Sequence, residues 1–316
     1  MKVICNTKHD YPDSIYSWIN YDEFLDDKKN LVYVYAIFGG ELPDGYKNKI
    51  YFNVEEPNGL YHSSKLFPER ELSGRILNHD WTAILQMCYH STEWLRNVLG
   101  YKQYQWVAHF PMFDFKYLPS ANTEKIYDLM YQGNIHGYKR EFSQCIDIMT
   151  KYKYVWTCIS AEHDPRKTHI LVQYPEKLKL MAQSKMTIID NRLFEPYPGA
   201  FVSNITKLPQ WNLNEAFSHI KEGIMPQFKI KATEHMLTRT LCLVKRNDWN
   251  VMELHGFEEG EHFLYYDDIY ELKSLIDECL ANWSNCEAIV ENAFNKAKKE
   301  NSSEAFYTQY LKPYDI

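Results

Sequence analysis

The chain has 316 residues, of which 45% are hydrophobic and 24% charged, and it carries a formal net charge of −7. This composition is typical of a folded globular protein and excludes wholesale disorder, and the length fits two domains of about 150 residues each. The acidic balance argues against a surface built throughout for polyanions, although it is compatible with a local basic groove.

Cysteine usage and hydropathy predict a soluble, cytoplasmic protein. The 7 cysteines include no C-x-x-C pair, which favours buried or free thiols in a reducing compartment over a disulfide or zinc framework. The longest apolar run, Leu31–Phe38, is far shorter than the ~20 residues that cross a bilayer. The first residues also lack the apolar stretch of a signal peptide.

Short β-rich runs alternate with amphipathic segments along the first half of the chain, which is typical of α/β units with parallel strands. The expected strands are Leu31–Phe38, Ile50–Val54, Ala83–Cys88 and Gln105–Phe110. One helix, Glu93–Leu99, is expected between the last two of these strands. Ser91 or Thr92 is the expected cap of that helix, and Gly100 ends it. The stretch from Phe110 to Asn122 contains prolines and shows no periodicity, which indicates an interdomain linker.

The alternation resumes after this linker. The expected strands are Lys125–Tyr131, Tyr154–Ser160, Met186–Asp190, Leu241–Lys245 and His262–Tyr266. The expected helices are Lys139–Thr150, Glu176–Gln183, Asn212–Glu222, Gln227–Leu237, Ile269–Leu280, Cys286–Lys298 and Ser303–Leu311. The sequence therefore predicts an α/β fold of two Rossmann-like domains, at residues 1–118 and 119–300, with a last helix at 301–316 that returns to the first domain.

Several common motifs are missing, which narrows the function. The chain contains no G-x-x-x-x-G-K-[ST], no G-x-G-x-x-G after a strand, no H-E-x-x-H and no G-x-S-x-G. P-loop ATPases, the usual dinucleotide-binding proteins and α/β-hydrolases are therefore disfavoured. An α/β architecture with an interdomain cleft remains, and such a cleft is a frequent place for a ligand.

The turn after the expected strand Lys125–Tyr131 is the first candidate for a phosphate site. Gly133 would let the backbone pass close to a ligand, and the next helix would direct its N–H groups at an anion. Asn134 and His136 lie in the same loop and are candidate contacts. The alternative is an ordinary turn between a strand and a helix.

The segment Met225–His235 is the second candidate, since Pro226 is expected to begin a helix that carries Lys229 in its first turn. Lys231 and Glu234 are three residues apart and share one helical face. Such a lysine suits a diphosphate, and such a carboxylate suits ribose hydroxyls. The alternative is a surface ion pair between the two residues.

The order and context of three segments in the second half resemble the C-terminal, donor-binding domain of GT-B glycosyltransferases, in the divergent group similar to family 1. These segments are Lys125–Gly133, Tyr174–Asn191 and Gln227–Glu234, the last resembling a Q-x-K-x-R-x-x-E pattern. In the first half, Cys88–Leu95 is similar to the C-x-S-x-W-L stretch of that group. The resemblance covers residues 120–316 well and 50–118 faintly. It implies a GT-B fold with two Rossmann-like domains facing a cleft, acceptor side first and nucleotide-sugar donor side second, followed by C-terminal helices.

The resemblance implies an enzyme that moves a sugar from a nucleotide-sugar donor to a glycan or other acceptor, without a cofactor or a bound metal. In that family the basic residues of the pattern, here Lys229 and Lys231, contact the donor diphosphate, and the acid, here Glu234, holds the ribose. The E-x7-E pair of many retaining members is absent, and Lys231 stands where arginine is common. The donor nucleotide and the stereochemical course therefore stay open.

A base that deprotonates the acceptor is expected at the end of a strand in the first domain, where α/β sheets place functional groups. Glu55 and Glu56 follow one expected strand, and His90 follows another. The alternatives are a solvated turn for the glutamates and a helix cap for His90. Asn191, after a strand of the second domain, is a candidate contact for the base or sugar of the donor.

Two other functions stay open. One is a nucleotide- or glycan-binding module that has the fold without the chemistry, and the other is a phage-type glycosyltransferase that modifies DNA bases. The net charge of −7 disfavours a nucleic-acid acceptor. For the enzyme, the sequence predicts that Lys231→Ala and Glu234→Ala both weaken donor binding and leave thermal stability nearly unchanged.

Overall fold

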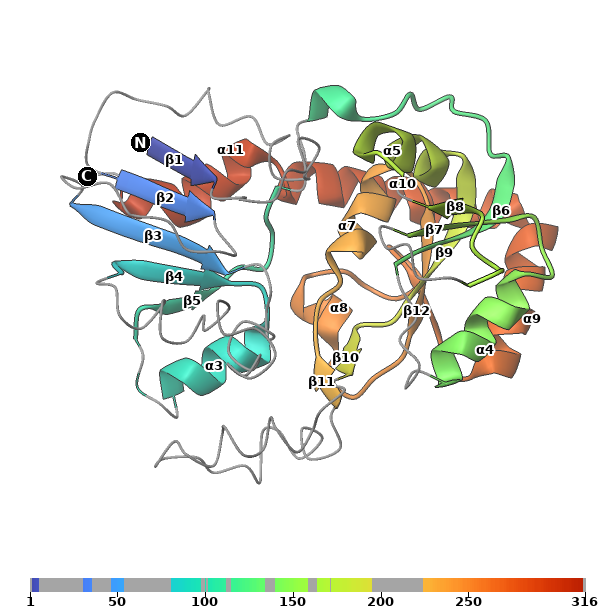
Figure 1. Cartoon of the computed structure of the whole chain (residues 1–316), viewed down its shortest axis with the longest axis horizontal. Helices are drawn as coiled ribbons and strands as arrows, with labels where there is room; N and C mark the ends of the chain where they lie inside the picture. Colours follow the sequence, from blue (N-terminus) through green and yellow to red (C-terminus); the bar gives the residue numbers. More distant parts are fainter. Residues whose placement is uncertain are drawn as a thin grey trace. The chain divides into compact units, whose positions relative to one another are not determined.

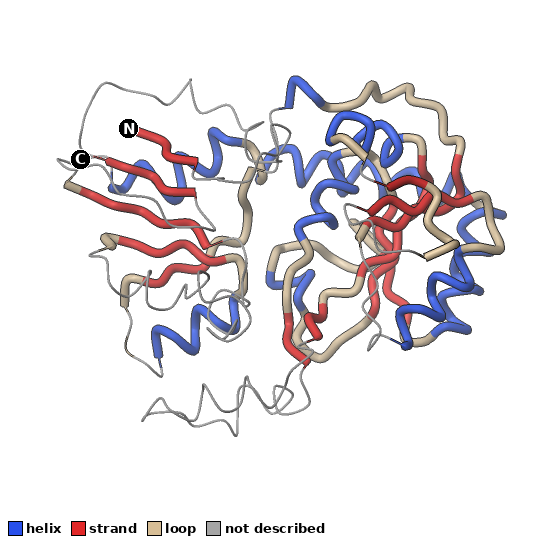
Figure 2. Tube along the Cα trace, viewed as in Figure 1, coloured by secondary structure: helices blue, strands red, loops and turns tan. Residues whose placement is uncertain are grey.

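The computed structural model describes residues 2–5, 31–35, 47–53, 81–97, 100, 102–111, 115–133, 140–158, 164–170, 172–194 and 224–314. The chain divides into two compact units, each built on its own parallel sheet (Figures 1 and 2). Unit 1 comprises Met1–Pro111, Arg192–Gln227 and Ser302–Ile316, and unit 2 comprises Met112–Asn191 and Phe228–Asn301. The grouping of Arg192–Gln227 with unit 1 differs from the expected boundaries, which place this segment in the second domain.

The described part of unit 1 contains a parallel sheet with the order β1-β2-β3-β4-β5. The strands are β1 (Lys2–Cys5), β2 (Leu31–Tyr35), β3 (Asn48–Asn53), β4 (Ala83–Gln86) and β5 (Tyr104–Trp106). The residues of β4 are all buried, as expected for a strand of a parallel sheet covered on both faces. The sequence predicted four of these strands and missed β1.

Helix α3 (Tyr89–Asn97) follows β4 and begins earlier than predicted. Thr92 is not its cap, because the Thr92 hydroxyl donates back to the Cys88 carbonyl at 2.8 Å from within the helix. A short antiparallel pair, β10 (Arg192–Phe194) and β11 (Ile224–Pro226), also belongs to unit 1. The Cys88 thiol donates to the Pro226 carbonyl at 3.5 Å.

The C-terminal residues of the chain pack within unit 1. They form α11 (Ser303–Phe306), a π-helical turn η6 (Tyr307–Leu311) and a 3-10 turn η7 (Lys312–Tyr314). The Phe306 ring lies 5.7 Å from the ring of Phe52 in β3, and the Ala108 amide donates to the Tyr310 hydroxyl at 3.2 Å. These contacts, which involve buried aromatic residues, bring the end of the chain onto the first sheet.

Unit 2 contains a six-stranded parallel sheet of described strands, in the order β13-β12-β9-β6-β7-β8. The strands are β6 (Tyr127–Gln132), β7 (Tyr154–Cys158), β8 (His169–Ile170), β9 (Ser184–Ile189), β12 (Leu241–Lys245) and β13 (Leu264–Tyr266). Their order along the chain reverses between β6 and β9, as in the dinucleotide-binding α/β fold. In such sheets ligands bind at the carboxyl ends of the strands beside this reversal.

Helices cover both faces of the second sheet (Figure 1). Apolar residues of one face, among them Leu129, Trp156 and Ile188, pack with buried residues of α4 and α9. On the other face, Thr187 of β9 hydrogen-bonds His235 of α7 at 3.1 Å. The helices of unit 2 are α4 (Arg140–Met149), α5 (Tyr174–Ala182), α7 (Ile230–Leu237), α8 (Val251–Leu254), α9 (Ile269–Ala281) and α10 (Trp283–Glu300).

Helix α7 begins later than the sequence predicted. Pro226 does not start it, because Pro226 is the last residue of β11 and pairs there with Arg192. Proline is accepted at such a position because this short strand pairs on one side only among the described residues. Lys229 is the N-cap of α7, with an extended backbone, so it precedes the first turn.

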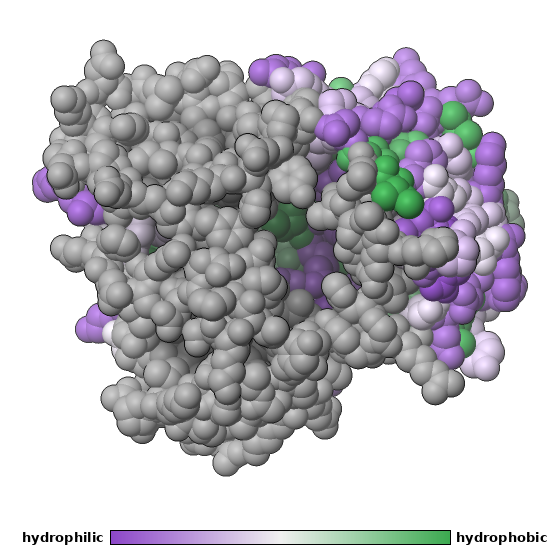
Figure 3. Space-filling view, in the orientation of Figure 1, coloured by the Kyte–Doolittle hydropathy of each residue, from purple (hydrophilic) through white to green (hydrophobic). Residues whose placement is uncertain are grey.

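The side chains of Cys88, Cys145, Cys242, Cys279 and Cys286 are buried thiols, which confirms the prediction of buried thiols for these five cysteines. No helix among the described residues has the length and apolarity needed to span a membrane. Hydrophilic residues cover much of the described surface of unit 2 on the face drawn in Figure 3. The predicted helix Asn212–Glu222 lies outside the described residues.

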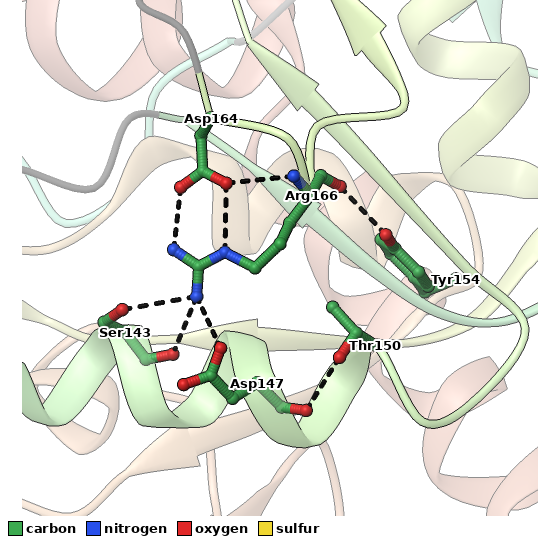
Figure 4. A network of polar contacts seen from close by, with 6 residues as sticks. All are labelled: Ser143, Asp147, Thr150, Tyr154, Asp164 and Arg166. Carbon is green, nitrogen blue, oxygen red and sulfur yellow. Dashed lines mark hydrogen bonds and ion pairs between the residues drawn. The ribbon is translucent and has the colours of Figure 1, made fainter.

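Arg166 ties the segment before β8 to helix α4 (Figure 4). Its guanidinium bonds both carboxylate oxygens of Asp164, at 3.0 and 2.7 Å, and one oxygen of Asp147 at 2.6 Å. The same group contacts the Ser143 hydroxyl at 3.3 Å and lies 5.6 Å from the Trp156 ring centroid. This hydrogen bonding lowers the pKa of the Asp164 carboxyl.

We expect Arg166→Met to lower the free energy of unfolding by about 1–2 kcal/mol, because charge-assisted hydrogen bonds are lost from a partly exposed site. Since Arg166 holds the pKa of Asp164 below its unfolded value, this contribution is present above pH ~4 and is lost as the pH falls further. Urea unfolding at pH 7 and pH 3 tests both statements. Lys273→Met, which removes an exposed pair with Asp277, is the control and should change stability by less than about 0.5 kcal/mol.

Candidate functional site

The turn that follows β6 is shaped around Gly133. This residue has a φ of +122°, a conformation that side chains with a Cβ rarely adopt. The turn is held on both sides, because the Gly133 amide donates to the Thr157 carbonyl at 3.0 Å and the Trp156 indole donates to the Gly133 carbonyl at 2.8 Å. The backbone at the carboxyl end of β6 therefore has a defined shape.

Lys231 of α7 reaches this turn. Its ammonium donates to the Gln132 carbonyl at 2.9 Å and lies 4.3 Å from the centroid of the Tyr131 ring. It also lies 3.8 Å from the place that a Cβ on residue 133 would occupy. The two phosphate-site candidates, Gly133 and Lys231, are thus brought together by the fold although they are far apart in the sequence.

Asn191 lies just after β9, at the same edge of the sheet. Its side chain is fully buried, and its carbonyl oxygen accepts a hydrogen bond from the Lys229 amide at 3.0 Å. The amide nitrogen of the same side chain is buried without a hydrogen-bond partner in the described structure. A buried N–H donor without a partner costs about 1–3 kcal/mol, so this group is suited to meeting an acceptor from a ligand or a water.

Glu234 is buried and belongs to a cluster that the sequence did not indicate. Its carboxylate accepts from the Tyr174 hydroxyl at 2.7 Å and from the Lys177 ammonium at 2.7 and 2.8 Å. The alternative of a surface pair with Lys231 is wrong, because the partner of Glu234 comes from α5 and the two side chains are only 2% (Glu234) and 12% (Lys177) exposed. Burial lowers the pKa of Lys177, and the Glu234 carboxylate opposes this shift.

The imidazole of His235, the residue after Glu234, is kept neutral by its surroundings. Burial lowers its pKa well below 6.5, and the positive charges of Lys231, Lys177 and Lys125 lower it further. One ring nitrogen hydrogen-bonds the Thr187 hydroxyl at 3.1 Å, and the other has no partner among the described residues. His235 therefore adds no positive charge at neutral pH.

Two polar residues that the sequence did not single out lie at the ends of β6 and β7. Gln132 and Thr157 face each other in the register of the parallel pair. The side-chain oxygen of each is buried without a hydrogen-bond partner in the described part of the chain. The available signal was a polar residue at or next to the carboxyl end of a strand, where α/β sheets place ligand contacts.

The other predicted site residues have different outcomes. Glu55, Glu56, Asn134 and His136 lie outside the described residues. His90 is the second residue of α3 in unit 1, half-buried, with its ring 5.5 Å from that of Tyr89. Its assignment as a base stays a prediction. No group of three or more His, Cys, Asp or Glu residues arranged for a metal ion occurs in the described ranges.

Several solved structures are similar to this chain in fold. A sucrose-phosphate synthase from Thermosynechococcus elongatus has 10% sequence identity and a TM-score of 0.52, covering 90% of this chain and 72% of its own. HepE of Anabaena in complex with UDP-glucose has 11% identity and a TM-score of 0.54, covering 90% and 78%. An α-glucosyltransferase in complex with UDP-glucose and DNA containing an abasic site has 10% identity and a TM-score of 0.55, covering 91% and 80%.

These similarities show the fold. No family model and no curated protein sequence matches the chain. At the level of structure, the chain has the α/β GT-B fold with C-terminal helices, as the sequence resemblance implied.

Proposed function

We propose that the chain is a glycosyltransferase that takes a sugar from a nucleotide-sugar donor. The observation that carries this proposal is the convergence of Lys231 and Gly133 at the carboxyl edge of the second sheet, beside the reversal in strand order. A cation over a glycine turn at this edge is an arrangement suited to a diphosphate. The GT-B fold, shared with proteins solved with UDP-glucose, supports the same ligand class.

Helix α7 supplies further positive potential for the leaving diphosphate. Its N-cap, Lys229, makes no side-chain cap hydrogen bond, and the positive end of a helix dipole attracts an anion. The unpartnered side-chain N–H of Asn191 adds a donor at the same helix start. In the proposed reaction the bond between the sugar and the diphosphate breaks while the acceptor oxygen bonds the sugar. Lys231, Lys229 and these N–H groups stabilise the charge that develops on the diphosphate.

Unit 1 supplies the acceptor side in this proposal, with Glu55, Glu56 or His90 as the base that removes the acceptor proton. Their common feature is a position directly after a strand expected from the sequence. The acceptor itself is a glycan or another hydroxyl compound.

We expect the purified chain to hydrolyse or transfer from one of UDP-, GDP- or ADP-glucose, and to do so in the presence of EDTA, because lysines and helix N–H groups supply the positive charge. Release of nucleoside diphosphate, measured by a coupled assay with and without excess EDTA, tests this. A chain that binds and turns over none of these donors contradicts the proposal. Turnover that EDTA abolishes contradicts only its metal-independent form.

A nucleic-acid acceptor is a second candidate, supported by the similarity to an α-glucosyltransferase solved with DNA. The net charge of −7 argues against it. Duplex binding that weakens steeply between 50 and 200 mM salt would favour this acceptor, because counterions are released when lysines meet phosphates.

A further inference from the structure

We propose that Gln132 and Thr157 form a recognition site for the nucleoside part of the donor, and this inference rests on the proposed function. Their side-chain oxygens are buried, lack hydrogen-bond partners in the described structure, and belong to register partners on neighbouring strands. Neighbouring strands lie about 4.8 Å apart, so one planar or cyclic ligand group can contact both oxygens.

The register places both side chains on the face of the sheet that α7 covers. Met130 pairs with Thr187, and Thr187 hydrogen-bonds His235 of α7. Gln132 is two residues beyond Met130 and therefore points to the same face. Thr157 shares this face, since it is the register partner of Gln132.

The start of helix α5 lies over the same face. Tyr174, in its first turn, and Lys177 both bond Glu234 of α7, so the two helices are joined there. Gln132 lies next to this joined helix pair, because Lys231, one turn before Glu234 on α7, donates to the Gln132 main-chain carbonyl, and Thr157 is the register partner of Gln132. This position is one residue before Gly133, where the diphosphate is proposed to bind.

The burial of the two oxygens selects the nucleoside over the transferred sugar. The reacting carbon of the sugar has to meet an acceptor that comes from outside unit 2, so the sugar requires access. The nucleoside does not react, so it does not need this access. Binding energy from such a non-reacting part positions the reacting centre.

The two oxygens also define the chemistry that they recognise. The side-chain oxygen of Gln132 (Oε1) can only accept a hydrogen bond, while the Thr157 hydroxyl can donate and accept. A nucleoside that presents an N–H or O–H beside an acceptor satisfies both, and an analogue without the N–H or O–H leaves them unpartnered. Such a site rejects the analogue strongly, because buried polar groups then stay without partners.

The test compares Thr157→Val with Thr187→Val, two isosteric replacements on the same sheet face. Calorimetric titration with UDP, CDP, ADP and GDP, and with UDP-glucose, measures binding, and thermal melting measures stability. We expect Thr157→Val and Gln132→Met to weaken the best-bound nucleoside diphosphate about tenfold without lowering the melting temperature, since each removes a buried group that lacks a partner. Thr187→Val should leave binding unchanged and lower the melting temperature, because its hydroxyl is bonded to His235.

Three results overturn the inference. In the first, the wild type binds a nucleoside diphosphate, and Thr157→Val and Gln132→Met bind it with the same affinity. This result overturns the inference and leaves the proposed function intact. Weakened binding of UDP-glucose with unchanged binding of UDP assigns the pair to the sugar instead. Failure of the wild type to bind any of the five probes overturns both the inference and the proposed function.

Discussion

Glu234→Ala is expected to lower the free energy of unfolding by about 3–5 kcal/mol, measured by urea denaturation at pH 7. The replacement leaves the Lys177 ammonium buried without the carboxylate that now bonds it through both oxygens. It also removes the acceptor of the Tyr174 hydroxyl. Breaking a buried ion pair from one side is costly because the remaining charge is not solvated.

Glu176→Ala is the matched control, since Glu176 forms an exposed pair with Lys179 on the same helix. It should change stability by less than about 0.5 kcal/mol. The double replacement Lys177→Met with Glu234→Gln should recover most of the loss, because no buried charge remains. A Glu234→Ala protein as stable as the wild type would mean that solvent reaches Lys177, and would contradict the buried geometry.

This expectation reverses the one drawn from the sequence for the same residue. The spacing of Lys231 and Glu234 correctly places them on one helical face, but it carries no information about α5, which supplies the actual partner. Lys177 lies 57 positions from Glu234, and only the packing of α5 on α7 brings them together. For Glu234, a loss of donor binding on mutation therefore has to be separated from a loss of folding.

The pattern of apolar residues along the chain was sufficient to predict the long and buried elements of unit 2. Strand β12, at Leu241–Lys245, matches its predicted bounds because it is a continuous apolar run in the middle of a parallel sheet. Strands β8 and β11 were not predicted, since runs of two or three residues have no periodicity to detect. Pro226 was taken as a helix start because its fixed φ suits both a first helical turn and a strand end.

The candidate site was predictable where a residue type alone carries the chemistry. Gly133 and the lysines of Met225–His235 were found this way, since a glycine turn and a cation are recognisable signs of an anion site. Gln132 and Thr157 were missed because their significance lies in the absence of hydrogen-bond partners, which depends on strand register. Register between strands distant in sequence is set by tertiary packing, so no pattern along the chain reveals it.

Lys231→Met is expected to lower kcat for donor turnover by about 10²–10³-fold, because it removes a positive charge from the place where the leaving diphosphate is proposed to lie. The melting temperature should change little, since Lys231 is only partly buried and surface-proximal lysine contacts contribute little to stability. This separates Lys231 from Glu234, whose loss should act on folding first. Steady-state release of nucleoside diphosphate from the preferred donor measures the effect.

Lys179→Met serves as the control, because the Lys179 side chain is 60% exposed and pairs with Glu176 at the surface. Lys231→Arg should recover part of the rate, since arginine keeps the charge but presents it as a planar fork. If Lys231→Met lowered the melting temperature as much as Glu234→Ala and left kcat unchanged, the ammonium would be holding the β6 turn in place. Loss of turnover with an unchanged melting temperature means instead that the fold places this cation for the donor, at a turn whose φ of +122° at Gly133 is one that other residues rarely adopt.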